Sequence, residues 1–226
     1  LGTFVTLLMY CFRDRERILD LFEMLCGARV TVSYMRPGGV FQDAPEDFWP
    51  SLDVFLNEMP GYIDDLEGPI SDNEIVLART RDVGILTAEQ AINTSATGPV
   101  LRASGVQWDI RKADPYEIYD RVEFDVPIGA VGDVFDRYFV SIQGMRESVK
   151  IIWQCIEQMP EGPVKADVPF YVRAPEGDAY GAVEAPKGEL GFYLVSDGGI
   201  SPYRCKIRSP SFINLTPLRD MLVGWK

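Results

Sequence analysis

The sequence has 226 residues, 46% of them hydrophobic, and a formal net charge of −12 at neutral pH. This length is enough for one large domain or two small ones with a substantial core. The excess of acidic residues argues against nucleic acid or an anionic membrane surface as a direct partner, because like charges repel. Histidine is absent, which excludes Ser-His-Asp and Cys-His catalytic centres within this chain.

The cysteines do not form a metal-binding pattern. Cys11, Cys26, Cys155 and Cys205 are scattered, whereas zinc and iron–sulfur sites need several thiolate or imidazole ligands at close spacing. We therefore expect the chain to bind no metal or other cofactor itself. Isolated cysteines in a chain of this size fit a reducing cytosol better than a secreted disulfide scaffold. The longest apolar run, residues 4–12, is too short to span a bilayer.

Apolar spacing and capping signals predict four helices in the first hundred residues. They cover Phe12–Cys26, Asp47–Leu66, Glu74–Arg79 after a cap at Ser71 or Asn73, and a segment opened by the capping box Thr87–Gln90. Pro60 should kink or divide the second of them. Between the first two, Val30–Tyr34 alternates like a strand. A sharp turn follows at 36–40, where Gly38 and Gly39 allow positive φ or a close backbone approach.

The segment 98–120 combines charges of both signs with Trp108, Tyr116 and Tyr119, but it has little regular periodicity. A flexible linker would be poor in aromatic residues. We therefore interpret this segment as an ordered central crossover, held by ion pairs and aromatic packing. Arg102, Arg111 and Lys112 are expected to be internal ion-pair partners. The crossover is either purely structural or functional, as long ordered loops often are.

The strongest periodic signal predicts a long helix that begins near Asp133 and ends at Pro160 and Gly162. Its apolar residues alternate spacings of three and four, so we expect Ile142, Val149 and Ile156 to be buried in one stripe. The opposite face is polar. The stripe comprises Phe135, Tyr138, Ile142, Met145, Val149, Ile152, Ile156 and Met159, and the polar face comprises Arg137, Gln143, Glu147, Lys150 and Gln154.

The last quarter of the chain has the pattern of an antiparallel meander. The predicted strands are Ala179–Ala185, Leu190–Ser196 and Tyr203–Arg208, separated by turn residues. The fold class expected is mainly α with a small antiparallel β subdomain. The expected organisation is a helical body over 1–162 that includes the crossover 98–120, a β subdomain over 163–215, and the start of a truncated C-terminal helix over 216–226.

Four blocks of sequence carry a resemblance to a known family. These blocks, at 36–40, 97–120, 132–152 and 187–215, closely resemble the 49-kDa subunit of respiratory complex I, which in bacteria is called NADH–quinone oxidoreductase. The match runs through nearly the whole chain. Because family members are longer, the resemblance implies a fragment that lacks both termini.

The resemblance implies a fold like the large subunit of nickel–iron hydrogenases and a place in the peripheral arm of a proton-pumping complex. Quinone would be the substrate, reduced in a cavity next to a [4Fe–4S] cluster that a neighbouring subunit holds. Other complex I subunits would be the partners, at the cytoplasmic face of the bacterial inner membrane, and the isolated fragment would be inactive. The histidine and tyrosine that bind the quinone head group in the family would precede Leu1, so no catalytic residue is assigned here.

The resemblance also places Thr31, Tyr34, Arg36, Gly38 and Gly39 near the quinone and the cluster. Thr31 occupies the position where many relatives have a histidine, so a titratable imidazole is lost. Tyr34 would line the cavity or pack in the core. Arg36 would be a fixed cation facing the cluster–quinone junction, or a structural ion-pair partner of an acid such as Asp43, Asp109 or Asp120.

Two other functions remain open at this point. The chain could be a non-catalytic assembly module derived from the same fold, which binds protein partners but no quinone. It could also belong to a hydrogenase-like or ferredoxin-fed complex. Flanking sequence with a histidine and tyrosine would favour the quinone function, and terminal cysteine pairs would favour the hydrogenase-like one.

Overall fold

The computed structural model describes residues 5–169 and 171–224, and the chain divides into two compact units. One unit comprises 1–71 and 152–170, and the other comprises 72–151 and 171–226. This division differs from the expected boundary at 162. The strands belong with the preceding crossover because the sheet packs against short helices from both sides of it in the sequence.

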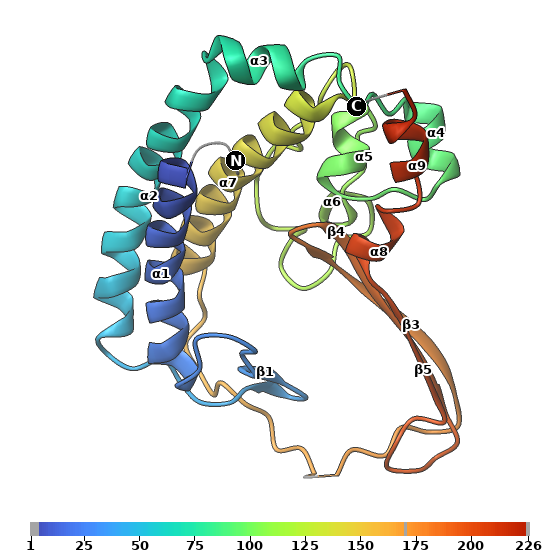
Figure 1. The fold of residues 1–226 in the computed structure, drawn as a ribbon. Helices are drawn as coiled ribbons and strands as arrows, with labels where there is room; N and C mark the ends of the chain where they lie inside the picture. Colours follow the sequence, from blue (N-terminus) through green and yellow to red (C-terminus); the bar gives the residue numbers. More distant parts are fainter. Residues whose placement is uncertain (1–4, 170, 225–226) are drawn as a thin grey trace. The chain divides into compact units, whose positions relative to one another are not determined.

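The first unit is built on two helices, α1 (Val5–Cys26) and α2 (Phe48–Ser71), which lie side by side (Figure 1). Helix α1 begins earlier than predicted and ends as predicted, because Gly27 adopts φ +70° and its amide bonds the Glu23 carbonyl at 2.8 Å. Helix α2 contains Pro60 and Pro69 and is not divided by either. The buried residues of the pair are Leu7, Asp14, Leu19, Leu21, Phe48, Phe55, Leu56, Ile63, Leu66 and Ile70.

The strand predicted at Val30–Tyr34 is wrong. Strand pairing begins only at β1 (Met35–Arg36), which pairs with β2 (Gly39–Val40) in a small antiparallel hairpin. Thr31 has φ +58°, which interrupts extended backbone in the segment that was expected to be a strand. The predicted turn is confirmed: Pro37 and Gly38 connect the paired residues Arg36 and Gly39.

Four short helices open the second unit: α3 (Glu74–Thr80), α4 (Ala88–Asn93), α5 (Pro99–Ala103) and α6 (Ile110–Ala113). Both predicted caps are confirmed. The Asn73 side chain accepts hydrogen bonds from two amides of α3, and Thr87 with Gln90 forms the full capping box of α4. The crossover 98–120 therefore includes two helical turns, α5 and α6, that the sequence pattern did not indicate.

Helix α7 (Val134–Glu157) confirms the predicted long helix, but its burial pattern corrects the predicted stripe. Ile142 is buried as expected, whereas Val149 and Ile156 are only half-buried. The predicted polar face is also wrong at Glu147, which is buried. Its carboxylate accepts hydrogen bonds from the Asp125 amide at 2.9 Å and from Lys150 at 2.5 Å. The helix thus also packs along a second line, formed by Val140, Glu147 and Ile151.

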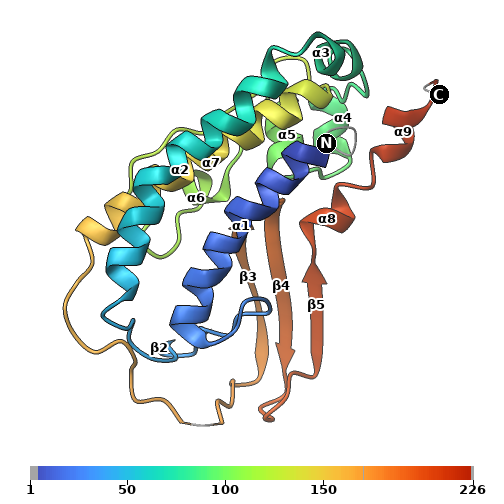
Figure 2. The same ribbon diagram turned by 60° about the vertical axis from the view of Figure 1, so that its left-hand side comes forward.

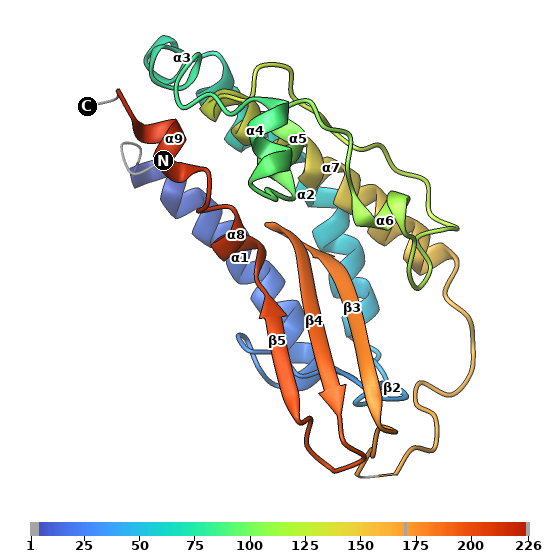
Figure 3. The ribbon, with the colours of Figure 1, turned by 90° about the vertical axis from the view of Figure 1, so that its right-hand side faces the viewer.

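The predicted meander is confirmed as a three-stranded antiparallel sheet in the order β3 (Gly177–Ala185), β4 (Gly188–Ser196) and β5 (Arg204–Arg208). Figures 2 and 3 show the three strands side by side. Two short helices follow, α8 (Pro210–Ile213), which the sequence pattern did not indicate, and α9 (Leu218–Leu222). Helix α9 begins after Pro217 as expected and ends at Leu222. Residues 225–226 of the predicted C-terminal helix lie outside the described residues.

A mainly helical chain with small antiparallel sheets is the fold class that the sequence predicted, and it is confirmed. Among the described helices, none combines the length and the apolar character needed to cross a bilayer.

The start of α7 leads to a prediction about pH. The Asp136 carboxylate accepts hydrogen bonds from the amides of Ala130, Val131 and Gly132 at 3.0, 2.6 and 3.0 Å. Partial burial opposes its charge, but these three bonds hold the pKa of Asp136 below its ordinary value. Asp136 therefore contributes stability above the pKa of an unfolded aspartate, and this contribution is lost as the pH falls through the lowered folded pKa.

We expect Asp136→Asn to be less stable than the wild type at neutral pH, and the difference to shrink on acidification below about pH 4. Urea unfolding at a series of pH values measures this difference. A gap between the two proteins that stays constant down to about pH 2, below both pKa values, would contradict the assignment.

Candidate functional site

Four of the five residues assigned to the site lie in or directly before the β1–β2 hairpin. Arg36 is exposed at its turn, with Nε donating to the Ser33 carbonyl at 3.4 Å and the guanidinium lying 4.4 Å from the centre of the Phe41 ring. It forms no ion pair within the described residues, so the alternative of a pair with Asp43, Asp109 or Asp120 is wrong. The aromatic face and the carbonyl orient the cation but leave its charge uncompensated.

Tyr34 fixes the hairpin to helix α1. Its hydroxyl donates to the Gln42 carbonyl at 2.8 Å, and the Gln42 side chain donates to the Leu25 carbonyl in the last turn of α1 at 2.9 Å. The ring is half-buried. Burial raises the pKa of Tyr34, with smaller contributions from the charges of Asp43 and Cys26. Tyr34 is therefore a neutral anchor at physiological pH.

The two glycines bring the hairpin against a second segment of the same unit. The Ala166 amide donates to the Gly38 carbonyl at 2.8 Å, and the Val40 amide donates to the Val164 carbonyl at 3.0 Å. A Cβ at Gly39, which has φ +143°, would lie 2.3 Å from the Val164 carbonyl oxygen. Only glycine fits this approach, so the turn that carries Arg36 is fixed on both sides.

Thr31 lies apart from this arrangement. It precedes the hairpin, its side chain is exposed, and its hydroxyl donates to the Val30 carbonyl at 2.6 Å. The neighbouring Arg29, which the sequence analysis did not single out, forms ion pairs with three carboxylates of α1: Glu16, Asp20 at 2.6 Å, and Glu23 at 2.8 Å. These pairs hold the segment before Thr31 back against the helix.

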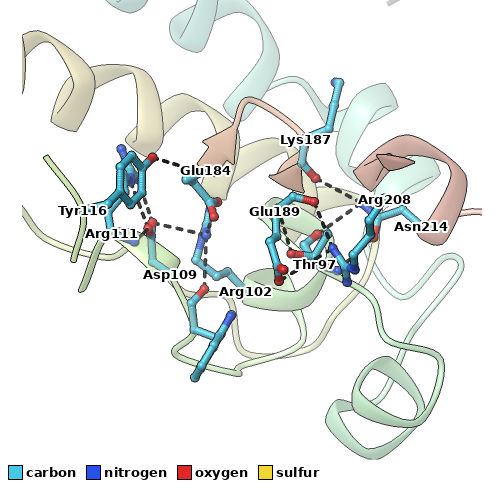
Figure 4. Close-up of polar contacts among 11 residues, drawn as sticks. Thr97, Arg102, Asp109, Arg111, Tyr116, Glu184, Lys187, Glu189, Arg208 and Asn214 are labelled. Carbon is cyan, nitrogen blue, oxygen red and sulfur yellow. Dashed lines mark hydrogen bonds and ion pairs between the residues drawn. The ribbon is translucent and has the colours of Figure 1, made fainter. Parts of the chain in front are cut away.

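A second polar cluster lies in the other unit, where the crossover meets the sheet (Figure 4). Arg102 is buried and bonds Glu184 at 2.9 Å, and its guanidinium lies 3.3 Å from Asp109. Arg111 binds the same Asp109 carboxylate through two nitrogens, at 2.9 and 2.6 Å. The prediction that Arg102 and Arg111 are internal ion-pair partners is confirmed. We call these four residues the buried charge cluster.

The two acids of the buried charge cluster are shifted in opposite directions. Burial favours the neutral form of Asp109, but the hydrogen bonds and charges of Arg111 and Arg102 outweigh it and lower its pKa. For Glu184 burial dominates and raises the pKa, with Arg102 opposing it and Asp109 adding to it. Tyr116 holds the same strand from outside the cluster, because its hydroxyl accepts a hydrogen bond from the Glu184 amide at 2.9 Å.

Lys112 corrects a third expectation. It forms no ion pair with the described residues, and its amine lies 4.4 Å from the centre of the Phe124 ring. Arg111 stacks on the same ring at 4.7 Å. Aromatic packing around Phe124, Tyr119 and Tyr116 thus holds the crossover together with the ion pairs, as predicted.

The described residues contain no group of three or more Cys, Asp or Glu side chains placed to hold a metal ion. The four cysteines are all unpaired, and none has a second thiol as a neighbouring ligand. This donor set does not fit an iron–sulfur cluster, which needs several thiolates converging on one site.

The comparison with known proteins decides the family. The profile described as "Respiratory-chain NADH dehydrogenase, 49 Kd subunit" matches residues 1–173 and 170–226, which together cover the chain. The chain belongs to this family. The four blocks that carried the resemblance form the β1–β2 hairpin, the crossover, helix α7, and the region from β4 through α8.

Curated relatives of the 49-kDa family agree over the whole chain, and each is named as one subunit type of NADH-quinone oxidoreductase. The relative from Dehalococcoides mccartyi is 54% identical over 226 residues, which are 100% of this chain and 62% of the relative. The relative from Roseiflexus sp. is 50% identical over 234 residues, covering 100% and 63%. The relative from Clostridium beijerinckii is 50% identical over 216 residues, covering 96% and 58%. The chain thus spans about three fifths of the length of these relatives.

Proposed function

We propose that this chain is part of the quinone-site subunit of an NADH–quinone oxidoreductase. It shapes a cavity for quinone beside a [4Fe–4S] cluster that a neighbouring subunit holds, in the peripheral arm of a proton-pumping complex at the cytoplasmic face of the membrane. Membership in the 49-kDa family and the names of the curated relatives support this proposal. The similarity to nickel–iron hydrogenase large subunits, inferred from the sequence, belongs to the same proposal.

The observation that carries the proposal is the exposed Arg36 on a stiff turn. Tyr34 anchors the hairpin to α1, and Gly38 and Gly39 lie against the backbone at 164–166. A guanidinium that is always protonated, held without a counter-ion, stabilises negative charge that develops nearby. Reduction of a quinone or of an iron–sulfur cluster adds such negative charge. Held in this way, Arg36 would stabilise it without first reorganising the turn.

The test replaces Arg36 in the assembled complex. We expect Arg36→Met to lower NADH:quinone reductase activity by about ten- to a hundredfold, since one preorganised electrostatic contact contributes a few kcal/mol. Electron transfer from NADH to an artificial acceptor should survive, because it does not involve the quinone cavity. Arg36→Lys should restore part of the loss, because it keeps the charge but not the planar fork.

The matched control is Arg121→Met, which removes an exposed arginine that has only a loose 3.9 Å contact with Asp120. It should leave both activities unchanged. Retained quinone reductase activity in Arg36→Met would show that the turn is purely architectural. Loss of both activities through failed assembly would favour the alternative of a non-catalytic assembly module.

A further inference from the structure

A cavity of about 470 Å³ lies in front of the buried charge cluster, entirely within the second unit. Three segments line it: the crossover with Arg102, Arg111 and Tyr119, one face of α7, and the β3–β4 turn from Glu184 to Lys187. This volume falls in the range of small-molecule sites. None of the residues assigned above to the quinone region lines it.

Nitrogen donors at this cavity are left without acceptors. The Nε of Arg102 is buried and has no hydrogen-bond partner in the described part of the chain. Such an orphaned donor costs free energy unless a water or a ligand accepts from it. Arg111 uses two of its three nitrogens on Asp109, and the Lys187 amine has no ion-pair partner among the described residues.

The charges around the cavity favour an anion. Asp109 and Glu184 neutralise the two guanidinium groups, so Lys187 leaves the wall with a net positive charge in a chain whose net charge is −12. Because burial raises the pKa of Glu184, repulsion of an anion by this one acidic wall residue is reduced.

Helix α7 leaves the space open. Ser141, Gly144, Met145 and Ser148 form the face that lines the cavity, and a Cβ added at Gly144 would have nothing within 4 Å. Glycine within a helix costs about 1 kcal/mol relative to alanine. A glycine kept at the wall of a cavity is therefore consistent with a space that something occupies.

We propose that this cavity binds a small oxyanion, with Arg102, Arg111 and Lys187 as the donors. Guanidinium groups donate to the oxygens of phosphate and carboxylate in a fixed planar geometry, and Lys187 adds charge from the turn. The bound anion would accept from the orphaned donor of Arg102 and connect the crossover to the β3–β4 turn. This proposal is independent of the quinone role.

The test uses hydrogen exchange in the assembled complex, which locates binding on the sequence. Inorganic phosphate at about ten times its dissociation constant should slow exchange of 99–113 and 184–188 by about tenfold, because binding stabilises the protected state in proportion to occupancy. Sodium chloride at the same ionic strength should not. Equal protection by both salts, or by neither, would overturn the proposal.

Gly144→Leu is the decisive variant, because it fills the cavity without touching the buried charge cluster and improves helix propensity. It should abolish the protection by phosphate. The matched control is Gly61→Leu, since Gly61 also lies within a helix with open space at its Cβ position, outside this cavity. Lys187→Ala should weaken phosphate binding and Lys112→Ala should not. Protection that persists in Gly144→Leu would refute the site.

Discussion

Replacing Arg102 with methionine is expected to lower the free energy of unfolding by about 3–5 kcal/mol, which is the cost of removing one partner of a buried ion pair. Arg102 is 7% exposed, and Asp109 and Glu184 around it are shielded from solvent. Methionine conserves most of the side-chain volume, so the loss arises from charge rather than from a cavity. Without Arg102, Glu184 keeps no direct ion-pair partner among the described residues, and its burial would strand a carboxylate.

Urea unfolding followed by tryptophan fluorescence measures this change. Arg121→Met is the control, because its ion pair with Asp120 is exposed on both sides and should contribute less than about 1 kcal/mol. The variant Arg102→Met with Glu184→Gln should recover part of the loss, since the glutamine carries no charge to strand. Equal stability of Arg102→Met and Arg121→Met would show that the buried charge cluster does not hold this unit together.

The second large effect is expected at Gly98, which precedes helix α5. Gly98 has φ +64° and ψ −143°, a conformation that is essentially restricted to glycine. A Cβ there would lie 2.5 Å from the Gly188 Cα and from the Lys187 carbonyl oxygen, both of which belong to the backbone of the β3–β4 turn. Neither atom can move away as a flexible side chain would.

Gly98→Ala should therefore cost more than about 3 kcal/mol, the sum of backbone strain and a clash between two backbones. Asn214 ties the same two segments together, because its side chain bonds the Thr97 backbone at 2.9 and 3.1 Å and the Lys187 carbonyl at 3.1 Å. A shift that relieves the clash would break these bonds. Thermal unfolding of the variant provides the measurement.

Gly105→Ala separates the two contributions. Gly105 also has positive φ, +83°, but the nearest atom to an added Cβ is 3.6 Å away, which is ordinary contact. It should carry only the cost of the left-handed backbone, about 1–2 kcal/mol. If Gly98→Ala is no worse than Gly105→Ala, the close approach of the crossover to the β3–β4 turn is not rigid.

The sequence predicted the elements whose signals are local. The Asn73 cap, the Thr87–Gln90 capping box and the end of α1 at Gly27 each depend on residues within one or two helical turns, and all are confirmed. The meander was predictable because strand alternation and the turns between strands are also local. The short helices α5 and α6 were missed, because a single turn has too few residues to show periodicity.

The candidate site was predictable in part. The Arg36–Val40 turn follows from Pro37 and two glycines, but the strand expected before it fails because Thr31 takes positive φ. Arg36 was expected to pair with an acid if it were structural. The structure instead places Phe41 against it, a contact that charge pattern alone does not indicate. Val149 and Glu147 were misassigned for a related reason, since a helix that packs along two lines buries more than its apolar stripe.

By itself the sequence determined the fold class, most element boundaries, the family and the ion-pair character of Arg102 and Arg111. The tertiary structure alone decided which acids complete that cluster, which glycines hold two backbones together and where the cavity lies. The physical reason is range. Helix caps, turns and strand alternation follow from neighbours in sequence, whereas Glu184 reaches Arg102 across 82 residues only because the β3–β4 turn packs against the start of α5. Contacts at such separation leave no periodic trace in the chain.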